Sequence, residues 1–307
     1  MPAGGCNKAP AKVFAIGIVG FSPFNVETLE GFKTGMTELG YVEGRDIRYV
    51  HAWIDENNAQ IIDEKIREVF AQDLDLLYTM GINVDLRAKE LLKGTDMPVL
   101  FSGSSWPVEN GLVYSLKHPG GNMTGISIAQ GGDSKALEWL AAIVPDLKTI
   151  WVPYDPDEEN SGKELSKIKE TATRLGIGIL WQKVKSVEEA VSAIENLPKE
   201  VNAIFIMPSP VIDRNCDKLN RAAISRRIPV GASLKVDDSV LISLSSDFFA
   251  MGKKTARLAQ QIDQGIRPAD LPVETSEVAL TINLSTAEKI GISIPDDILT
   301  QATTIIH

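Results

Sequence analysis

The sequence predicts an α/β protein made of two similar lobes, each with a central parallel sheet, and three observations support this prediction. Short apolar runs rich in β-branched residues alternate with segments of helical periodicity. Features of the first half recur in order in the second half. The length of 307 residues, with 44% hydrophobic and 23% charged residues, fits a globular chain of two domains and excludes disorder, collagen and coiled coil.

The first half opens with an apolar run at 13–19, closed by Gly20 and Pro23, which predicts a buried strand and a loop. A helix is expected next, because apolar residues recur at three- and four-residue spacing from Val26 to Leu39 and Gly40 stands at the C-cap. The alternation continues with strands at 47–50, 74–79 and 99–101 and helices at 61–70 and 84–92. This order predicts a parallel sheet with helical crossovers.

The second half repeats this order. A strand at 149–153, a helix at 164–175 and a strand at 179–184 follow one another, and the Leu-Gly pairs at 39–40 and 175–176 lie 136 residues apart. Two further segments recur: 75–81 resembles 202–208, and 97–99 resembles 228–230. Four matches in the same order indicate two similar lobes in one chain.

The chain is expected to pass between the lobes more than once. The turn-rich segment 119–125 predicts a first joint, and 241–246 a second. A helix at 247–262 with Asp247 as N-cap, an extended run at 275–284 and a short helix at 285–290 capped by Ser285 follow. We predict a flexible tail at 1–11, a first lobe from 12–122 and 247–273, and a second lobe from 123–246 and 274–307, joined by a multi-strand hinge.

Charge and residue counts exclude several classes of protein. With 31 Lys and Arg against 41 Asp and Glu, the net charge of −10 disfavours a nucleic-acid partner. Three histidines and two cysteines, far apart in sequence, predict no metal site and no disulfide framework. Cys216 is expected to be a buried small apolar residue in a helix. No apolar run reaches the ~20 residues that span a bilayer.

The segment Ala3-Gly4-Gly5-Cys6 resembles the end of a bacterial lipoprotein signal, in which small residues precede the cysteine that is lipidated. The apolar stretch of such a signal does not precede it here, so we expect that the export signal has been removed. The alternative is a disordered tail with an incidental cysteine. The first interpretation predicts a periplasmic or cell-surface protein, lipid-anchored through Cys6.

A solute site is expected beyond the carboxyl ends of the strands, where loop amides and helix N-termini converge. These loops offer hydroxyl and amide groups and aromatic faces rather than charge, which suits a small, partly apolar organic molecule. The same residue types also serve as turns and caps. The candidate ligand-binding residues are Ser22, Phe24, Gly81, Ile82, Ser104, Ser105, Trp106, Tyr154, Asn160, Ser161, Ser209, Ser233 and Asp247.

The sequence contains few motifs that would indicate catalysis or cofactor binding. Gly17 and Gly20 lack the spacing of a dinucleotide fingerprint, and no P-loop ends in Lys-Ser or Lys-Thr. The segment holding Ser104 and Ser105 lacks the nucleophile-elbow pattern, and no histidine lies in the candidate loops. We therefore expect a protein without catalytic residues, cofactor or metal.

Several motifs together resemble a known family. These are Pro119-Gly-Gly-Asn-Met-Thr-Gly125, Tyr154-Asp-Pro with Asn160-Ser161, and the segments 265–273, 282–287 and 291–295. They are similar to the ABC-transporter substrate-binding family that includes tryptophan- and tyrosine-binding TrpX-like proteins. The resemblance covers about 13–298. It implies a type I periplasmic-binding fold with two Rossmann-like lobes, a monomer that delivers a small solute to a membrane permease, and a crossover at 124–127 that adds Thr124 to the candidate site.

Two positions depart from the family pattern. Ser105-Trp106-Pro107 stands where the family usually has Thr-Asp-Pro, and Ser209 stands where it usually has an acidic residue. An acidic side chain would pair with a ligand ammonium, so these departures favour a larger aromatic or less cationic solute stacked on Trp106 over a simple α-amino acid. The leading prediction is a solute-binding protein that closes by hinge motion. The alternative is a ligand-sensing module coupled to a membrane signalling partner.

Overall fold

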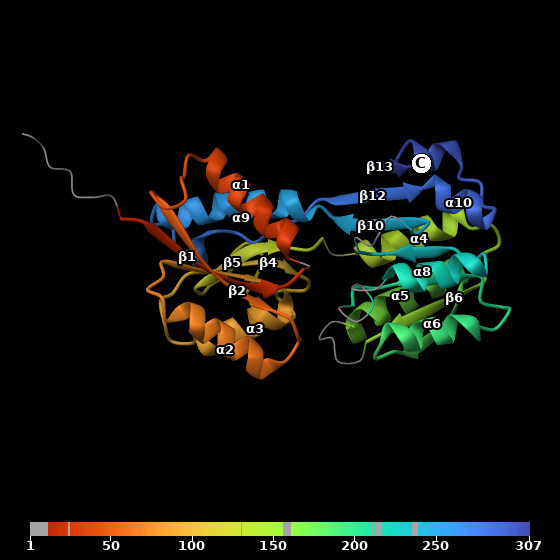
Figure 1. The fold of residues 1–307 in the computed structure, drawn as a ribbon, viewed down its shortest axis with the longest axis horizontal. Coiled ribbons are helices and arrows are strands. Elements are labelled where there is room, and N and C mark those ends of the chain that lie inside the picture. Colours follow the sequence, from red (N-terminus) through yellow and green to blue (C-terminus); the bar gives the residue numbers. More distant parts are fainter. Residues whose placement is uncertain are drawn as a thin grey trace, which may run out of the picture. The chain divides into compact units, whose positions relative to one another are not determined.

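The computed structural model describes residues 12–23, 25–129, 131–155, 161–209, 212, 216–234 and 239–307. The chain separates into two compact units. Unit 1 comprises Met1–Ile128 and Phe248–Ser276, and unit 2 comprises Ala129–Asp247 and Glu277–His307. Each unit holds one sheet with helices on its faces (Figure 1), which confirms the predicted α/β class.

The sheet of unit 1 has six strands, all parallel, in the order β11-β5-β4-β3-β1-β2. Crossover helices join the first four strands, as parallel pairing requires. In chain order the elements of unit 1 are β1 (Phe14–Phe21), α1 (Val26–Glu38), β2 (Ile47–Ile54), α2 (Ala59–Phe70), β3 (Leu76–Met80), α3 (Ile82–Leu91), β4 (Val99–Ser104), β5 (Met123–Ser127), α9 (Phe248–Asp263), the short 3-10 helix η1 (Pro268–Asp270) and β11 (Glu274–Thr275).

The sheet of unit 2 has seven strands in the order β13-β12-β10-β9-β8-β6-β7. Its pairs are parallel except β10 with β12. Its elements are α4 (Gly132–Ile143), β6 (Thr149–Tyr154), α5 (Ser161–Leu175), β7 (Gly178–Lys183), α6 (Val187–Glu195), β8 (Ala203–Ile206), α8 (Cys216–Ser225), β9 (Val230–Ala232), β10 (Ile242–Ser246), β12 (Val278–Asn283), α10 (Leu284–Ile290), α11 (Asp296–Leu299) and β13 (Thr304–Ile306).

The two sheets share one strand order over their first five strands. β2-β1-β3-β4-β5 in unit 1 corresponds to β7-β6-β8-β9-β10 in unit 2. The sequence matches at 75–81 with 202–208 fall on β3 and β8, and those at 97–99 with 228–230 fall just before or at the start of β4 and β9. The predicted similarity of the two halves is therefore a similarity of sheet topology.

Both faces of each sheet are packed, as the continuous apolar strands require. Along β1, Ile16 and Ile18 pack with α1 and α9 on one face, whereas Ala15 and Val19 pack with α2 and α3 on the other. In unit 2, one cluster includes residues of α4, α5 and α10, and another includes residues of α6 and α8. Cys216 is 3% exposed within the second cluster, as predicted.

Three details differ from the sequence expectations. The segment 123–128, assigned above to the second lobe, belongs to unit 1, because β5 pairs with β4 in its sheet. For the same reason 274–276 belongs to unit 1, since β11 pairs with β5. The cap of α10 is Asn283, whose side chain accepts a hydrogen bond of 2.6 Å from the Thr286 N–H, and not Ser285. The predicted tail at 1–11 lies outside the described residues.

Helices α1 and α9 approach so closely that glycine is required at their contact. A Cβ atom on Gly31 would lie 2.0 Å from the carbonyl oxygen of Phe249, and one on Gly252 would lie 2.0 Å from that of Thr28. Both obstacles are backbone atoms and cannot rotate away. The contact holds α1, which follows the first candidate loop, against α9.

We expect Gly31→Ala to lower the free energy of unfolding by about 1–3 kcal/mol, because the added methyl group forces the two helices apart. Gly162→Ala is the matched control in α5, where a Cβ meets nothing within 4 Å. That change should leave stability unchanged or raise it by up to ~1 kcal/mol. Urea unfolding of both variants measures the difference, and equal effects would contradict the close contact.

Candidate functional site

The carboxyl ends of β1, β3 and β4 lie side by side in unit 1 and bring three predicted loops together. Ser22 follows β1, Gly81 follows β3, and Ser104 ends β4. The Gly81 N–H donates to the Ser102 carbonyl at 3.3 Å, and the Ser22 N–H donates to the Ile54 carbonyl at 3.2 Å. Strand order reverses between β1 and β3, which is where open parallel sheets bind ligands.

A β-bulge at the end of β4 sets the direction of Ser104. Ser102 shares a hydrogen bond of 2.7 Å with Thr255 on α9, so strict alternation would point Ser104 to the same face. The pairing with β5 shifts between Ser102 and Ser104, and Gly103 there has φ +83°. The bulge turns Ser104 to the opposite face, where its hydroxyl donates to the carboxylate of Asp85 on α3.

Asp85 is a carboxyl group that the sequence analysis did not select. It is fully buried in the first turn of α3, and its Oδ1 atom has no hydrogen-bond partner within the described residues. Burial raises the pKa of Asp85 to about 7, while the Ser104 and Thr79 hydroxyls act in the opposite direction. The sequence pattern that could have identified Asp85 is its spacing: it lies three residues after Ile82 and three before Ala88, so it falls on the buried face of α3.

Trp106 follows the bulge and carries the aromatic face predicted for this edge. It is half-buried and has φ +56°, a conformation uncommon for residues other than glycine. Asn110 holds the turn, because its N–H donates to the Trp106 carbonyl at 2.9 Å and its side chain donates to the Ser105 carbonyl at 3.1 Å. Such backbone strain is typical of functional loops.

The carboxyl edge of unit 2 gathers the corresponding loops. Tyr154 ends β6 and contacts Trp181 edge to face at 5.7 Å. Buried Ser209 follows β8, and Ser233 follows β9, where its N–H donates to the Ile206 carbonyl at 3.1 Å. Ser161 is buried at the first residue of α5.

Asp133 adds a second carboxyl group that the sequence analysis did not select. It lies in the first turn of α4, and burial raises its pKa, while the Ser233 hydroxyl acts in the opposite direction. Because Ser233 follows β9, this carboxyl group lies at the carboxyl edge of the unit 2 sheet. The sequence pattern that could have identified Asp133 is its position directly after the Gly131-Gly132 turn.

Some predicted site residues lie elsewhere. Thr124 is fully buried inside β5, and its hydroxyl donates to the Leu271 carbonyl at 2.7 Å, so it ties the strand to the segment after η1. Ile82 packs in the core cluster of α2 and α3. Asp247 is exposed after β10, where its N–H donates to the Glu277 carbonyl at 3.3 Å. Phe24 and Asn160 lie outside the described residues.

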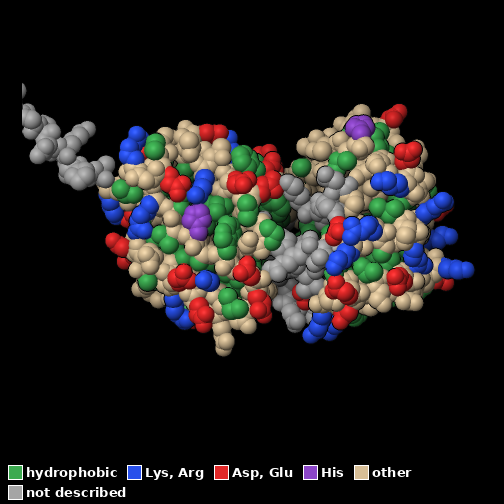
Figure 2. Space-filling view, in the orientation of Figure 1, with side chains coloured by type: hydrophobic (Ala, Val, Ile, Leu, Met, Phe, Trp, Pro, Cys, Tyr) green, Lys and Arg blue, Asp and Glu red, His purple; other side chains and the backbone are tan. Residues whose placement is uncertain are grey.

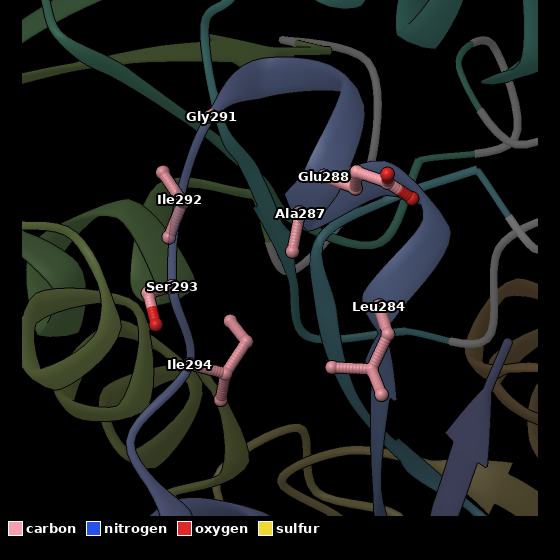
Figure 3. A pocket seen from close by; sticks show the side chains of 7 residues that line it. All are labelled: Leu284, Ala287, Glu288, Gly291, Ile292, Ser293 and Ile294. Carbon is pink, nitrogen blue, oxygen red and sulfur yellow. The ribbon is translucent and has the colours of Figure 1, made fainter.

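An open groove of about 480 Å³ lies at the other edge of the unit 2 sheet. Leu284 and Ala287 of α10 face Ser293 and Ile294 across it (Figure 3). Since β12 runs antiparallel to β10 and pairs Ile282 with Ile242, α10 begins beside the start of β10. The groove is therefore distant from the carboxyl edge that holds the candidate site.

The surface carries both charge signs. On the face drawn in Figure 2, acidic side chains are scattered among Lys and Arg on each unit. Among the described residues, no group of three or more His, Cys, Asp or Glu could hold a metal ion. No helix in the described ranges is long and apolar enough to cross a membrane.

A family model described as ABC transporter substrate binding protein matches residues 18–306. The chain belongs to this family. The match spans both units, and it confirms the resemblance found in the sequence. The family and the fold are those of solute-binding proteins rather than enzymes.

Three relatives illustrate the family. A tyrosine-binding protein of Clostridioides difficile is 28% identical over 264 residues, which are 84% of this chain and 74% of the relative. The crystal structure of an ABC domain in complex with L-Trp from Streptococcus pneumonia superposes with a TM-score of 0.87 at 25% identity, covering 96% of this chain and 100% of that chain. A conserved domain protein from Vibrio cholerae superposes with a TM-score of 0.86 at 25% identity and the same coverage.

We expect Asp85→Asn to change the pH dependence of stability. The carboxyl has a pKa of about 7 in the folded chain, against an ordinary value of 3.8, so the folded state binds more protons between these values. Wild-type stability therefore falls as pH rises from 4 to 7, by at most about 1.4 kcal/mol per pH unit, relative to the variant. Urea unfolding at a series of pH values measures this.

Asp63→Asn is the control. Hydrogen bonding to Arg87 at 2.6 Å lowers the pKa of Asp63, so this carboxyl stays ionised above pH 4. The stability difference between this variant and wild type should be constant from pH 5 to 8. If the stability of the wild type and that of Asp85→Asn changed in parallel between pH 4 and 7, Asp85 would have an ordinary pKa, contrary to the prediction.

Proposed function

We propose that the protein binds an aromatic amino acid and delivers it to an ABC permease in the membrane. The observation that carries the proposal is the family match over residues 18–306, together with relatives whose names state tyrosine and L-Trp as ligands. The candidate site supports it, because each unit brings hydroxyl groups, an aromatic ring and a carboxyl group to the carboxyl edge of its sheet, fully buried in Asp85 and partly buried in Asp133.

The aromatic side chain of the solute would stack on Trp106. An indole or phenol ring gains both apolar burial and a favourable ring-to-ring geometry against a half-buried indole. The turn held by Asn110 fixes this ring before the solute arrives, which lowers the entropy cost of binding. Tyr154 offers a second aromatic face, from unit 2.

The carboxyl groups change the expectation for the polar end of the solute. The loop positions 106 and 209 hold Trp and Ser, which from sequence alone disfavoured an ammonium group. Carboxyl groups from helix first turns lie at these edges instead: Asp133, which is partly exposed, and Asp85, which is fully buried and acts through its charge. We propose that one solute contacts both units and that closure by hinge motion captures it, with the three chain passages between the units serving as the hinge.

Isothermal titration with aromatic amino acids tests the ligand class. L-Trp, L-Tyr and L-Phe should bind, whereas ribose and myo-inositol should not. A ligand at 100 times its Kd should stabilise the protein by about 2.7 kcal/mol in unfolding experiments. If a sugar binds and no aromatic amino acid does, the proposed ligand class is wrong.

Trp106→Ala should weaken aromatic amino-acid binding by about 5- to 100-fold, which corresponds to ~1–3 kcal/mol of lost stacking and burial. Trp139→Ala is the matched control, because Trp139 lies on α4 beneath Lys135 at 4.9 Å, outside the candidate loops. Titration of both variants with L-Trp measures the effect. Equal affinity of Trp106→Ala and wild type would contradict stacking.

We also propose an extracytoplasmic location with a lipid anchor on Cys6, which lies outside the described residues. In a bacterial host that expresses the full gene, Cys6→Ala should move the protein from the membrane fraction to the soluble extracytoplasmic fraction. Cys216→Ala is the control, because that cysteine is buried. A wild type already found in the soluble fraction would contradict anchoring.

A further inference from the structure

Asp85 and Ser104 form a buried pair whose geometry is specific to the end of β4. Regular strand alternation would separate them, and only the bulge at Gly103 turns the Ser104 hydroxyl towards α3. The pair joins the start of α3 to the loop that carries Trp106 two residues later. It therefore connects two of the three loops gathered at the carboxyl edge of unit 1.

The hydrogen bonds of the pair are incomplete for an ionised carboxylate. Ser104 supplies one donor to Oδ2, and Oδ1 has no partner within the described ranges. The Thr79 hydroxyl, which also acts to lower the pKa of Asp85, donates to the Leu100 carbonyl at 3.3 Å. An ionised, fully buried carboxylate with so few donors is costly, so the protonated form competes with it near neutral pH.

The charged groups around the pair are engaged elsewhere. Arg87 on α3 pairs with Asp63 on α2 at 2.6 Å, and Lys89 donates to the carbonyls of Gly111 and Leu112. Tyr78 on β3 is neutral, because burial raises its pKa; its hydroxyl donates to Ser102 at 2.9 Å, which acts in the opposite direction but more weakly. On the helix α9, the polar neighbour of β4 is the uncharged Thr255. No described cation therefore compensates Asp85.

We propose that Asp85 is a positioning residue that acts through Ser104 on the Trp106 loop, and that binding of a solute ammonium drives release of its proton. When Asp85 is ionised, Ser104 donates to it; when Asp85 is protonated, its own O–H can donate to the Ser104 oxygen, which frees the Ser104 hydroxyl hydrogen. The two protonation states thus hold the start of the loop differently. A cationic ammonium at this edge favours the ionised state by Coulomb attraction.

This inference rests on the proposed function, and proton release on binding tests it. Titration calorimetry with L-Trp in buffers of different ionisation enthalpy counts the protons released. Wild type should release a fraction of one proton near pH 7. Below pH 7, its affinity for L-Trp should increase as the pH increases, by up to tenfold per pH unit. Indole-3-propionate, which lacks the ammonium, should release none.

Two variants separate positioning from structure. Asp85→Asn keeps a side chain of the same shape and should bind L-Trp without proton release and without the pH slope. Asp63→Asn should release as many protons as wild type, because the pKa of Asp63 is lowered by Arg87 and this carboxyl is already ionised. Proton release by Asp85→Asn equal to that of wild type, or none by wild type, would overturn the inference.

Trp106 fluorescence decides the matter without a solute. The emission of Trp106 is the difference in fluorescence between wild type and Trp106→Phe, and it should change with pH near neutrality. The corresponding difference between Asp85→Asn and the double variant Asp85→Asn/Trp106→Phe should not change with pH. A flat wild-type profile overturns the role of Asp85 even if L-Trp binds. If no aromatic amino acid binds but the profile titrates, the proposed function fails and the positioning role stands.

Discussion

Each sheet is parallel among its first five strands, so it must be covered on both faces, and neither unit achieves this with one continuous stretch of chain. In unit 1, α1 packs against α9, which the chain forms only after β10 of unit 2. In unit 2, Ala287 and Ile290 of α10 belong to the core cluster that holds residues of α4 and α5, and α10 forms only after β11 of unit 1. The core of each unit therefore depends on a helix that the chain forms after passing through the other unit, and repeated passage of the chain is a consequence of packing.

The same arrangement forms the edge that holds the candidate site. Parallel strands end together, so the loops after β1, β3 and β4 collect at one edge without further interactions. Two carboxyls reach the sheet edges from helix first turns: Asp85 on α3 and Asp133 on α4. Glycines then determine the directions of side chains. The bulge at Gly103 turns Ser104 to α3 and precedes the strained turn at Trp106.

Periodicity and recurrence predicted most strands, most helices and the two-lobe organisation, because these depend on local patterns that the chain repeats, whereas the family was predicted from the resemblance of specific motifs. The unit boundary was missed for a physical reason: the segment 119–125 contains turn residues, yet its last residues begin β5, whose pairing with β4 is a tertiary interaction. Thr124 was added to the site by the family resemblance, whereas its burial inside β5 depends on this same strand pairing. Asp85 escaped notice because a single acid in an apolar helix stripe carries no motif, and the bulge that directs Ser104 towards it depends on strand pairing.

Asp85 costs stability where it lies. A fully buried carboxyl whose Oδ1 atom has no partner among the described residues loses more by desolvation than its hydrogen bonds return, which raises its pKa to about 7. An asparagine could accept the same hydrogen bond from Ser104 without a charge, so the packing of α3 on β4 does not itself require an acid. Groups that lower stability without a structural gain are typical of functional sites. By this reasoning the fold does not require the carboxyl at the start of α3, and its cost is accounted for by the positioning role proposed above.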